Sequence, residues 1–325
     1  MSAIREENSS EIVRCPKPKL IVADKTAFLN ELKGCESSLF CIATKKETLE
    51  ALETIANENE AEVWRYSLTD VENSRKDFNW IKLCGDERMA SLLANTILNS
   101  KRYNLSEISY KIFLLQKVFG DIAKRDDGNP LLAYNEKNVI NPKAIPRTGQ
   151  MNGGQFTYYV WRFPVFAPCV GLDWLVEEPF RKFTVENGSQ SPDFSKLRNN
   201  KVIAYLDLTD LEGQDTTPLS SLFFTIALEQ LEKSDNTNTA YIFVDELTNI
   251  GQIRNLPIYI GLIRRFNIGL VLATSDLDKL AMIYGLDNAK VIIGNGLGLS
   301  SLDEIERIYS SSNPTNLENL EFGAK

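Results

Sequence analysis

Runs of apolar residues alternate with amphipathic segments in the first part of the chain. The runs are of strand length and lie at residues 19–24, 37–44 and 62–68. Between the last two, residues 45–60 carry apolar side chains three or four positions apart, which is the spacing of one helical face. Continuous apolar runs separated by helices are typical of strands buried on both faces of a parallel sheet. The pattern therefore predicts an α/β unit with right-handed crossovers.

The same alternation returns near residue 200. Further apolar runs lie at residues 202–208, 241–245, 269–274 and 290–294, with helical periods between them. We predict that all of these runs lie together in one doubly wound, mostly parallel sheet.

Residues 85–192 lack this strand pattern and interrupt the predicted sheet. Two long helical periods, at 86–100 and 105–125, have no strand between them, and a turn-rich stretch and an aromatic, proline-rich stretch follow. We predict a separate, mainly helical insertion that recruits partners. The chain then divides into a first part of the core at 17–84, the insertion at 85–192, a second part of the core at 193–310 and a flexible tail at 311–325.

Composition and charge exclude several classes of protein. The 325 residues carry a formal charge of -8, which argues against non-specific DNA binding through neutralised phosphates. The chain has no histidine, so histidine-based triads, proton shuttles and metal sites are excluded. Its five cysteines form no CxxC pair, and no apolar stretch reaches the roughly 18 residues that a membrane span needs. The first residues do not resemble a signal peptide, and together these features predict a cytoplasmic protein with no membrane span of its own.

The segment YIFVDE, residues 241–246, ends a predicted buried strand on two adjacent carboxylates. Ligands of parallel sheets bind just beyond the carboxyl ends of the strands. In nucleoside triphosphatases an Asp at this place, in the Walker B element, holds Mg²⁺. A following Glu can act as the general base toward water. Asp245 and Glu246 are therefore candidate catalytic residues, with Asp245 as the metal ligand; the alternative is a strand that ends in two solvated carboxylates.

Residues 243–295 resemble the type IV secretion and conjugation coupling proteins (TraG/TraD-like), a family of RecA-like P-loop ring ATPases. The family pattern is a DE pair, a Gly-bearing turn, an Arg-bearing helix, a strand, a helix of the form LxxIYG and a strand that ends in Asn. The matching positions are Asp245, Glu246, Gly251, Ile253, Asn255, Leu256, Arg264 or Arg265, Gly269, Leu277, Leu280, Ile283, Tyr284, Gly285 and Asn295. The resemblance implies a RecA-like α/β core, with the helical insertion in the place of the family's all-α domain.

The resemblance also shows where the chain departs from a working phosphate loop. Lys25 and Thr26 stand where the last two residues of G-x-x-x-x-G-K-[ST] would fall, but Lys19 and Asp24 occupy the two glycine positions. The loop is therefore expected to be deleted. Asp24 would also place negative charge at a helix N-terminus that should attract phosphate.

Two further nucleotide-contacting elements of the family are altered. In the place of its DPKGEL motif, Lys46 remains, whereas Thr44 replaces the Asp and Glu47 replaces the Gly. Ser275 stands where the family has a Gln that reads the γ-phosphate. Lys25, Thr26, Lys46 and Ser275 are thus the remnants of a cofactor site.

Two hypotheses follow from the resemblance. In the first, the chain is a non-hydrolysing recruiting or scaffold subunit without a cofactor. In the second, it is an active hexameric DNA or protein translocase that uses ATP and Mg²⁺ through a divergent phosphate loop, and Arg264 and Arg265 reach a neighbouring subunit's phosphate as an arginine finger. A third reading, an unrelated DNA-binding module, would have to use Arg254, Arg264 and Arg265 as a basic strip, and the composition supplies little more.

The resemblance implies the same partners for the first two hypotheses. They are the proteins of a secretion or conjugation machine, the DNA-processing complex, DNA itself and further copies of the chain in a ring. The implied location is the cytoplasm, with attachment to the inner membrane through partners.

Overall fold

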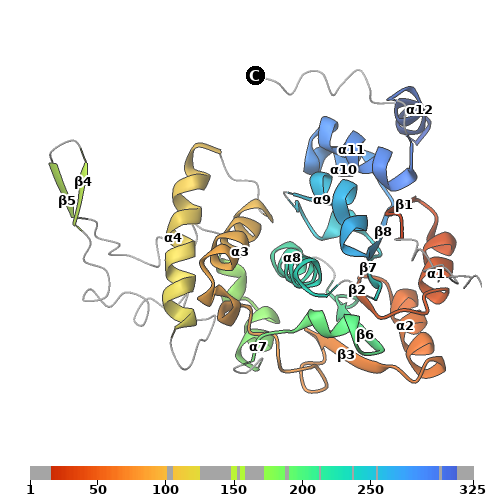
Figure 1. The fold of residues 1–325 in the computed structure, drawn as a ribbon, viewed down its shortest axis with the longest axis horizontal. Coiled ribbons are helices and arrows are strands. Elements are labelled where there is room, and N and C mark those ends of the chain that lie inside the picture. Colours follow the sequence, from red (N-terminus) through yellow and green to blue (C-terminus); the bar gives the residue numbers. More distant parts are fainter. Residues whose placement is uncertain are drawn as a thin grey trace, which may run out of the picture.

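The computed structural model describes residues 16–100, 105–124, 148–151, 154–157, 172–186, 190–211, 214–235, 238–253, 255–299 and 302–312. At its centre lies a six-stranded sheet in the order β1-β8-β7-β2-β6-β3, in which every neighbouring pair is parallel (Figure 1). The strands are β1 (Lys19–Val22), β2 (Leu39–Ala43), β3 (Glu62–Ser67), β6 (Val202–Asp207), β7 (Ala240–Val244) and β8 (Ile268–Thr274). The apolar runs predicted at these six places are confirmed as strands of one sheet.

The run at 290–294 is not a strand, and this prediction was wrong. It lies inside the helix α11 (Leu286–Leu297), which covers β1 near the edge of the sheet. Ala289, Ile292 and Ile293 are buried at helical spacing. A short apolar run fits a strand or a buried helix equally well, and only its flanking contacts decide.

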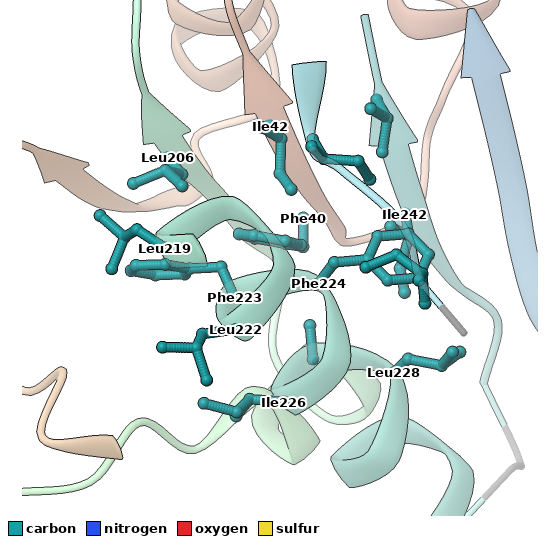
Figure 2. Close-up of a cluster of buried hydrophobic side chains, with 14 of the residues drawn as sticks. Phe40, Ile42, Leu206, Leu219, Leu222, Phe223, Phe224, Ile226, Leu228 and Ile242 are labelled. Carbon is teal, nitrogen blue, oxygen red and sulfur yellow. The ribbon is translucent and has the colours of Figure 1, made fainter. Parts of the chain in front are cut away.

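Helices cover both faces of the sheet (Figure 1). On one face, α1 (Lys25–Lys33) and α2 (Lys46–Glu58) bury Phe28, Leu32 and Leu52 against one set of strand side chains. On the other face, α8 (Thr217–Lys233) buries nearly all of its side chains. Figure 2 shows Phe223 and Phe224 of α8 beside strand residues, and the ring of Phe223 stacks on that of Phe40 at 6.1 Å between centroids. The strands alternate between these two clusters, as period-two side chains must.

The second half of the chain completes the layer around α8. It contributes η5 (Leu247–Asn249), α9 (Leu256–Leu262), η6 (Ile263–Phe266), α10 (Leu277–Tyr284), α11 and α12 (Leu302–Ser312). Their apolar side chains join the same hydrophobic cluster as α8.

Between β3 and β6, the described residues are mainly helical. They form η1 (Trp80–Gly85), α3 (Glu87–Ser100), α4 (Leu105–Ala123), η3 (Asp173–Val176), α7 (Phe180–Glu186) and η4 (Phe194–Arg198), with one small antiparallel pair, β4 (Thr148–Met151) and β5 (Gly154–Thr157). None of these residues joins the central sheet, and α3 packs on α8. The predicted fold class, a doubly wound parallel α/β sheet with a mainly helical insertion, is confirmed.

The proposed division into domains stays a prediction, because one hydrophobic cluster runs from the sheet through α8 to α3 and α4. Most of the predicted tail at 311–325 lies outside the described residues. Among the described helices, none combines the length and the apolar character that crossing a bilayer requires.

Candidate functional site

The predicted site lies at the carboxyl edge of the sheet. Asp245 and Glu246 follow β7, Thr44 follows β2 and Ser275 follows β8, while Lys25 opens α1 after β1. Parallel strands end at the same edge, so four separate segments of the chain meet here. The sequence placed the two carboxylates correctly with respect to the sheet.

The carboxylate of Asp245 is buried and already surrounded by donors. Asp245 is only 1% exposed. Its oxygens accept hydrogen bonds from the Thr44 main-chain N–H at 2.8 and 3.0 Å, from the Thr44 hydroxyl at 2.7 Å and from the Lys45 main-chain N–H at 3.0 Å. Asp245 thereby fastens the end of β7 to the turn after β2.

Burial dominates the electrostatics of this carboxyl. It raises the pKa of Asp245 above its ordinary value, while hydrogen bonds from Thr44 and Thr48 and the nearby Lys45 ammonium oppose the rise. The pKa is raised overall because the loss of hydration destabilises the ionised carboxylate more than these hydrogen bonds and the ammonium stabilise it.

Glu246 makes a similar connection on the other side of β7. It is 5% exposed, and its carboxylate accepts the Ser275 main-chain N–H at 3.1 and 3.3 Å and the Thr248 hydroxyl at 2.8 Å. The Lys45 ammonium lies 3.8 Å from Glu246 Oε2. Ser275 therefore contributes its main-chain N–H to a protein carboxylate at the place where the resemblance expects a phosphate sensor.

The connection between β1 and α1 consists of Ala23 and Asp24 alone. Ala23 has a left-handed backbone with φ of 52°, and its N–H donates to the Thr274 main-chain oxygen at 2.9 Å. Asp24 caps the helix, because its carboxylate accepts the Ala27 N–H at 2.8 Å. The helix N-terminus that would face a phosphate is thus satisfied by a carboxylate of the same chain.

A cavity of about 200 Å³ opens beside this connection. Its walls include Lys25, Lys45, Thr48, Asp245, Thr274 and Ser275. The Lys25 ammonium pairs with Glu47. Thr26, in the first turn of α1, is exposed and is not part of the cavity wall.

The remaining predicted site residues lie elsewhere. Lys46 is not part of the cavity wall and pairs with Asp210 at 3.1 Å. Arg264 and Arg265 are exposed in η6, directly before β8, and therefore lie at the amino edge of the sheet, opposite Asp245. Within one chain they do not join the site. Arg254 lies outside the described residues.

Sequence reasoning did not identify the partners of Asp245, namely Thr44, Lys45 and Thr48, although Thr44 was noted as the replacement of a family Asp. The position of β2 next to β7 brings them to the site, and the segment after β2 was the signal that could have found them. Among the described residues, no group of three or more acidic or cysteine side chains is arranged to hold a metal ion. Asp245 and Glu246 are instead occupied by protein donors.

Residues 172–307 match a protein-family model described as Type IV secretory system Conjugative DNA transfer. This segment includes Asp245, Glu246, Ser275 and the two arginines of η6, but not the β1–α1 connection. No match was found among curated proteins.

Solved structures of low sequence identity share the fold. The bacterial conjugative coupling protein TrwBdeltaN70, in an unbound form, has a TM-score of 0.54 at 12% identity, over 80% of this chain and 67% of that chain. The plasmid coupling protein TrwB in complex with ADP and Mg²⁺ has a TM-score of 0.51 at 12% identity, over 86% and 72%. VirB4 of Thermoanaerobacter pseudethanolicus has a TM-score of 0.54 at 12% identity, over 94% and 82%. Together with the family match, these confirm the resemblance to type IV secretion and conjugation coupling proteins.

Proposed function

We propose that this coupling-protein-like chain is a non-hydrolysing recruiting or scaffold subunit of a conjugative DNA transfer or type IV secretion machine. The family match over residues 172–307 supports a role in such a machine. The observation that carries the loss of hydrolysis is the two-residue connection between β1 and α1, Ala23 and Asp24. Its partners are then the proteins of that machine and the DNA-processing complex.

A phosphate-binding loop works by curling several main-chain N–H groups around the phosphates, with a helix N-terminus behind them. Two residues between strand and helix leave no loop to curl, and Asp24 takes an N–H of the first turn and adds negative charge. Each lost charge-assisted hydrogen bond costs about 1.5–3 kcal/mol. Losing two or three of them weakens nucleotide binding by about a hundredfold to a millionfold.

The residues present do not fit Mg²⁺ and ATP as a bound pair. Asp245, the expected metal ligand, is engaged by Thr44 and Lys45, and the Lys25 ammonium is engaged by Glu47. The alternative, an active Mg-ATP-dependent hexameric translocase, has one observation in its favour. Two carboxylates lie at the carboxyl edge of the sheet next to a cavity of about 200 Å³.

Calorimetric titration with ATP and Mg²⁺ tests the proposal directly. We expect no heat of binding at micromolar nucleotide, and no hydrolysis that falls when Glu246 is replaced by Gln. Glu58→Gln, an exposed position on α2, is the matched control for preparation-dependent background activity. Micromolar affinity, or turnover lost in Glu246→Gln but kept in Glu58→Gln, would establish the translocase instead.

A transfer assay in the host tests the scaffold role. Without the chain, DNA or protein transfer should fail, because the machine lacks a subunit. Complementation with Glu246→Gln should restore transfer to the wild-type level, since the proposed role needs no hydrolysis. A Glu246→Gln chain that accumulates normally but does not restore transfer would contradict the proposal.

A further inference from the structure

Two buried carboxylates next to each other need a cation. Asp245 and Glu246 are 1% and 5% exposed. An unpaired buried charge costs several kcal/mol, so such groups are compensated in stable proteins. In a nucleotide site the compensating cation would be Mg²⁺ bound together with ATP, a pair that these residues do not fit.

Lys45 supplies a cation at this place. Its ammonium donates to the Asp245 main-chain oxygen at 3.1 Å and lies 3.8 Å from Glu246 Oε2. The Lys45 side chain is 38% exposed, whereas the Glu246 side chain is 7% exposed, so the ammonium lies between the buried carboxylate and solvent. Its own main-chain N–H also donates to the Asp245 carboxylate.

Neighbouring lysines are engaged elsewhere. Lys25 pairs with Glu47, and Lys46 pairs with Asp210. In the described part of the chain, Lys45 is the cation that lies within 4.0 Å of the Glu246 carboxylate, and it also contacts the Asp245 main-chain oxygen. One residue of the turn after β2 thus provides both a main-chain donor and a charge to the site.

We infer that Lys45 is a resident counter-cation, standing in for the divalent ion that the two carboxylates would otherwise need. The inference deepens the proposed function and rests on it, because a site that carries its own cation is complete without Mg²⁺ or nucleotide. The cation at the site is then covalently part of the chain, and its presence does not depend on the metal concentration. Removing the ammonium leaves the Glu246 carboxylate and the Asp245 main-chain oxygen without their cation, and such oxygens are ligands that a hard divalent cation prefers.

The test is thermal unfolding with MgCl₂ alone, without nucleotide. Lys45→Met removes the ammonium and keeps most of the aliphatic stem. Lys45→Arg keeps a positive charge. Lys46→Met is the matched control, because this neighbour is 71% exposed in its side chain and pairs with an exposed carboxylate.

We expect wild type, Lys45→Arg and Lys46→Met to melt at similar temperatures, with no response to millimolar MgCl₂. Lys45→Met should melt several degrees lower, and millimolar MgCl₂ should restore at least half of that loss. A Lys45→Met protein as stable as the Lys46→Met protein would overturn the inference. So would a loss that MgCl₂ does not reverse, which would make Lys45 an ordinary ion-pair residue, or a wild type that MgCl₂ itself stabilises.

These outcomes are separable from the ATP titration. Micromolar ATP binding by wild type would refute the non-hydrolysing role, whatever the Mg²⁺ response of Lys45→Met. Failure of the Mg²⁺ rescue, with no ATP binding by wild type, would refute only the counter-cation.

Discussion

Replacing Arg198 with methionine removes a buried guanidinium that joins the amino ends of three strands. Arg198 lies at the end of η4, just before β6, and is 2% exposed. Its nitrogens donate to the main-chain oxygens of Leu231, Asn238, Phe266 and Asn267 at 2.5–3.1 Å and to the Ser234 hydroxyl at 3.2 Å. These acceptors lie at the end of α8 and just before β7 and β8, whose other ends carry Asp245, Glu246 and Ser275.

The expected loss follows from the hydrogen bonds that disappear. The bonds to the oxygens of Leu231 and Asn267 are fully buried, and each hydrogen bond from a charged donor contributes about 1.5–3 kcal/mol; the Ser234 hydroxyl still donates to the Leu231 oxygen in the variant and limits the loss there. Part of this loss is offset, because the variant no longer has to bury a cation. That burial is unfavourable for the charged form, since it lowers the pKa of Arg198. We expect Arg198→Met to lose roughly 3 kcal/mol of unfolding free energy. Arg198→Lys keeps the charge but not the planar fork, and should lose about half as much.

Urea unfolding followed by far-UV circular dichroism and tryptophan fluorescence measures the loss. The midpoint should fall while the slope with urea stays unchanged, since the surface exposed on unfolding is the same. Lys196→Met is the control, because Lys196 lies in the same turn with a side chain that is 52% exposed, and its loss should stay below about 0.5 kcal/mol. An Arg198→Met protein within that same margin of wild type would refute the reasoning.

Three further substitutions test single contacts. The pKa of the Glu232 carboxyl is raised, mainly by burial, so its contribution to stability is complete below its ordinary pKa and is lost as pH rises through the raised one. Glu232→Gln should therefore exceed wild type in unfolding free energy at pH 7 and lose that advantage in acid; an equal gap at both pH values would contradict this. A methyl group at Gly269 would lie 2.2 Å from Cδ1 of its cross-strand partner Tyr241, so Gly269→Ala should lose about 1–3 kcal/mol in urea unfolding, and little of that in a Tyr241→Ala background. Asp24→Ala should lose about 1 kcal/mol of stability with the helix cap, whereas Asp24→Asn, which can still cap, should lose little.

The sheet was predictable because its strands are short apolar runs bounded by polar turns. Runs such as residues 39–43 and 268–274 are buried at every position, as strands covered on both faces of a parallel sheet are. The prediction for the run at 290–294 was wrong because its buried residues also repeat at helical spacing. The position of a Cβ on Gly296 lies 2.5 Å from Leu20 Cβ, an approach between α11 and β1 that no local pattern contains.

The sequence predicted the position of the two carboxylates in the fold but not their hydrogen-bond partners. The predicted strand placed Asp245 and Glu246 at the carboxyl edge of the sheet, where the structure has them. Their partners could not be read locally, because Thr44 lies about 200 positions away in sequence and donates partly through its main chain, which carries no residue signature. The resemblance pointed to Lys46, whereas the ammonium at the carboxylates belongs to Lys45.

Asp245 and Glu246 connect strand ends on both sides of β7. Asp245 reaches the turn after β2, and Glu246 reaches Ser275 after β8. The sheet edge needs these bonds whether or not a nucleotide binds, since the main-chain N–H groups of Thr44 and Ser275 would otherwise lose their carboxylate acceptors. A DE pair after a buried strand therefore does not by itself distinguish a hydrolysing chain from a scaffold. The proposed absence of hydrolysis rests instead on the two residues between β1 and α1, across the cavity.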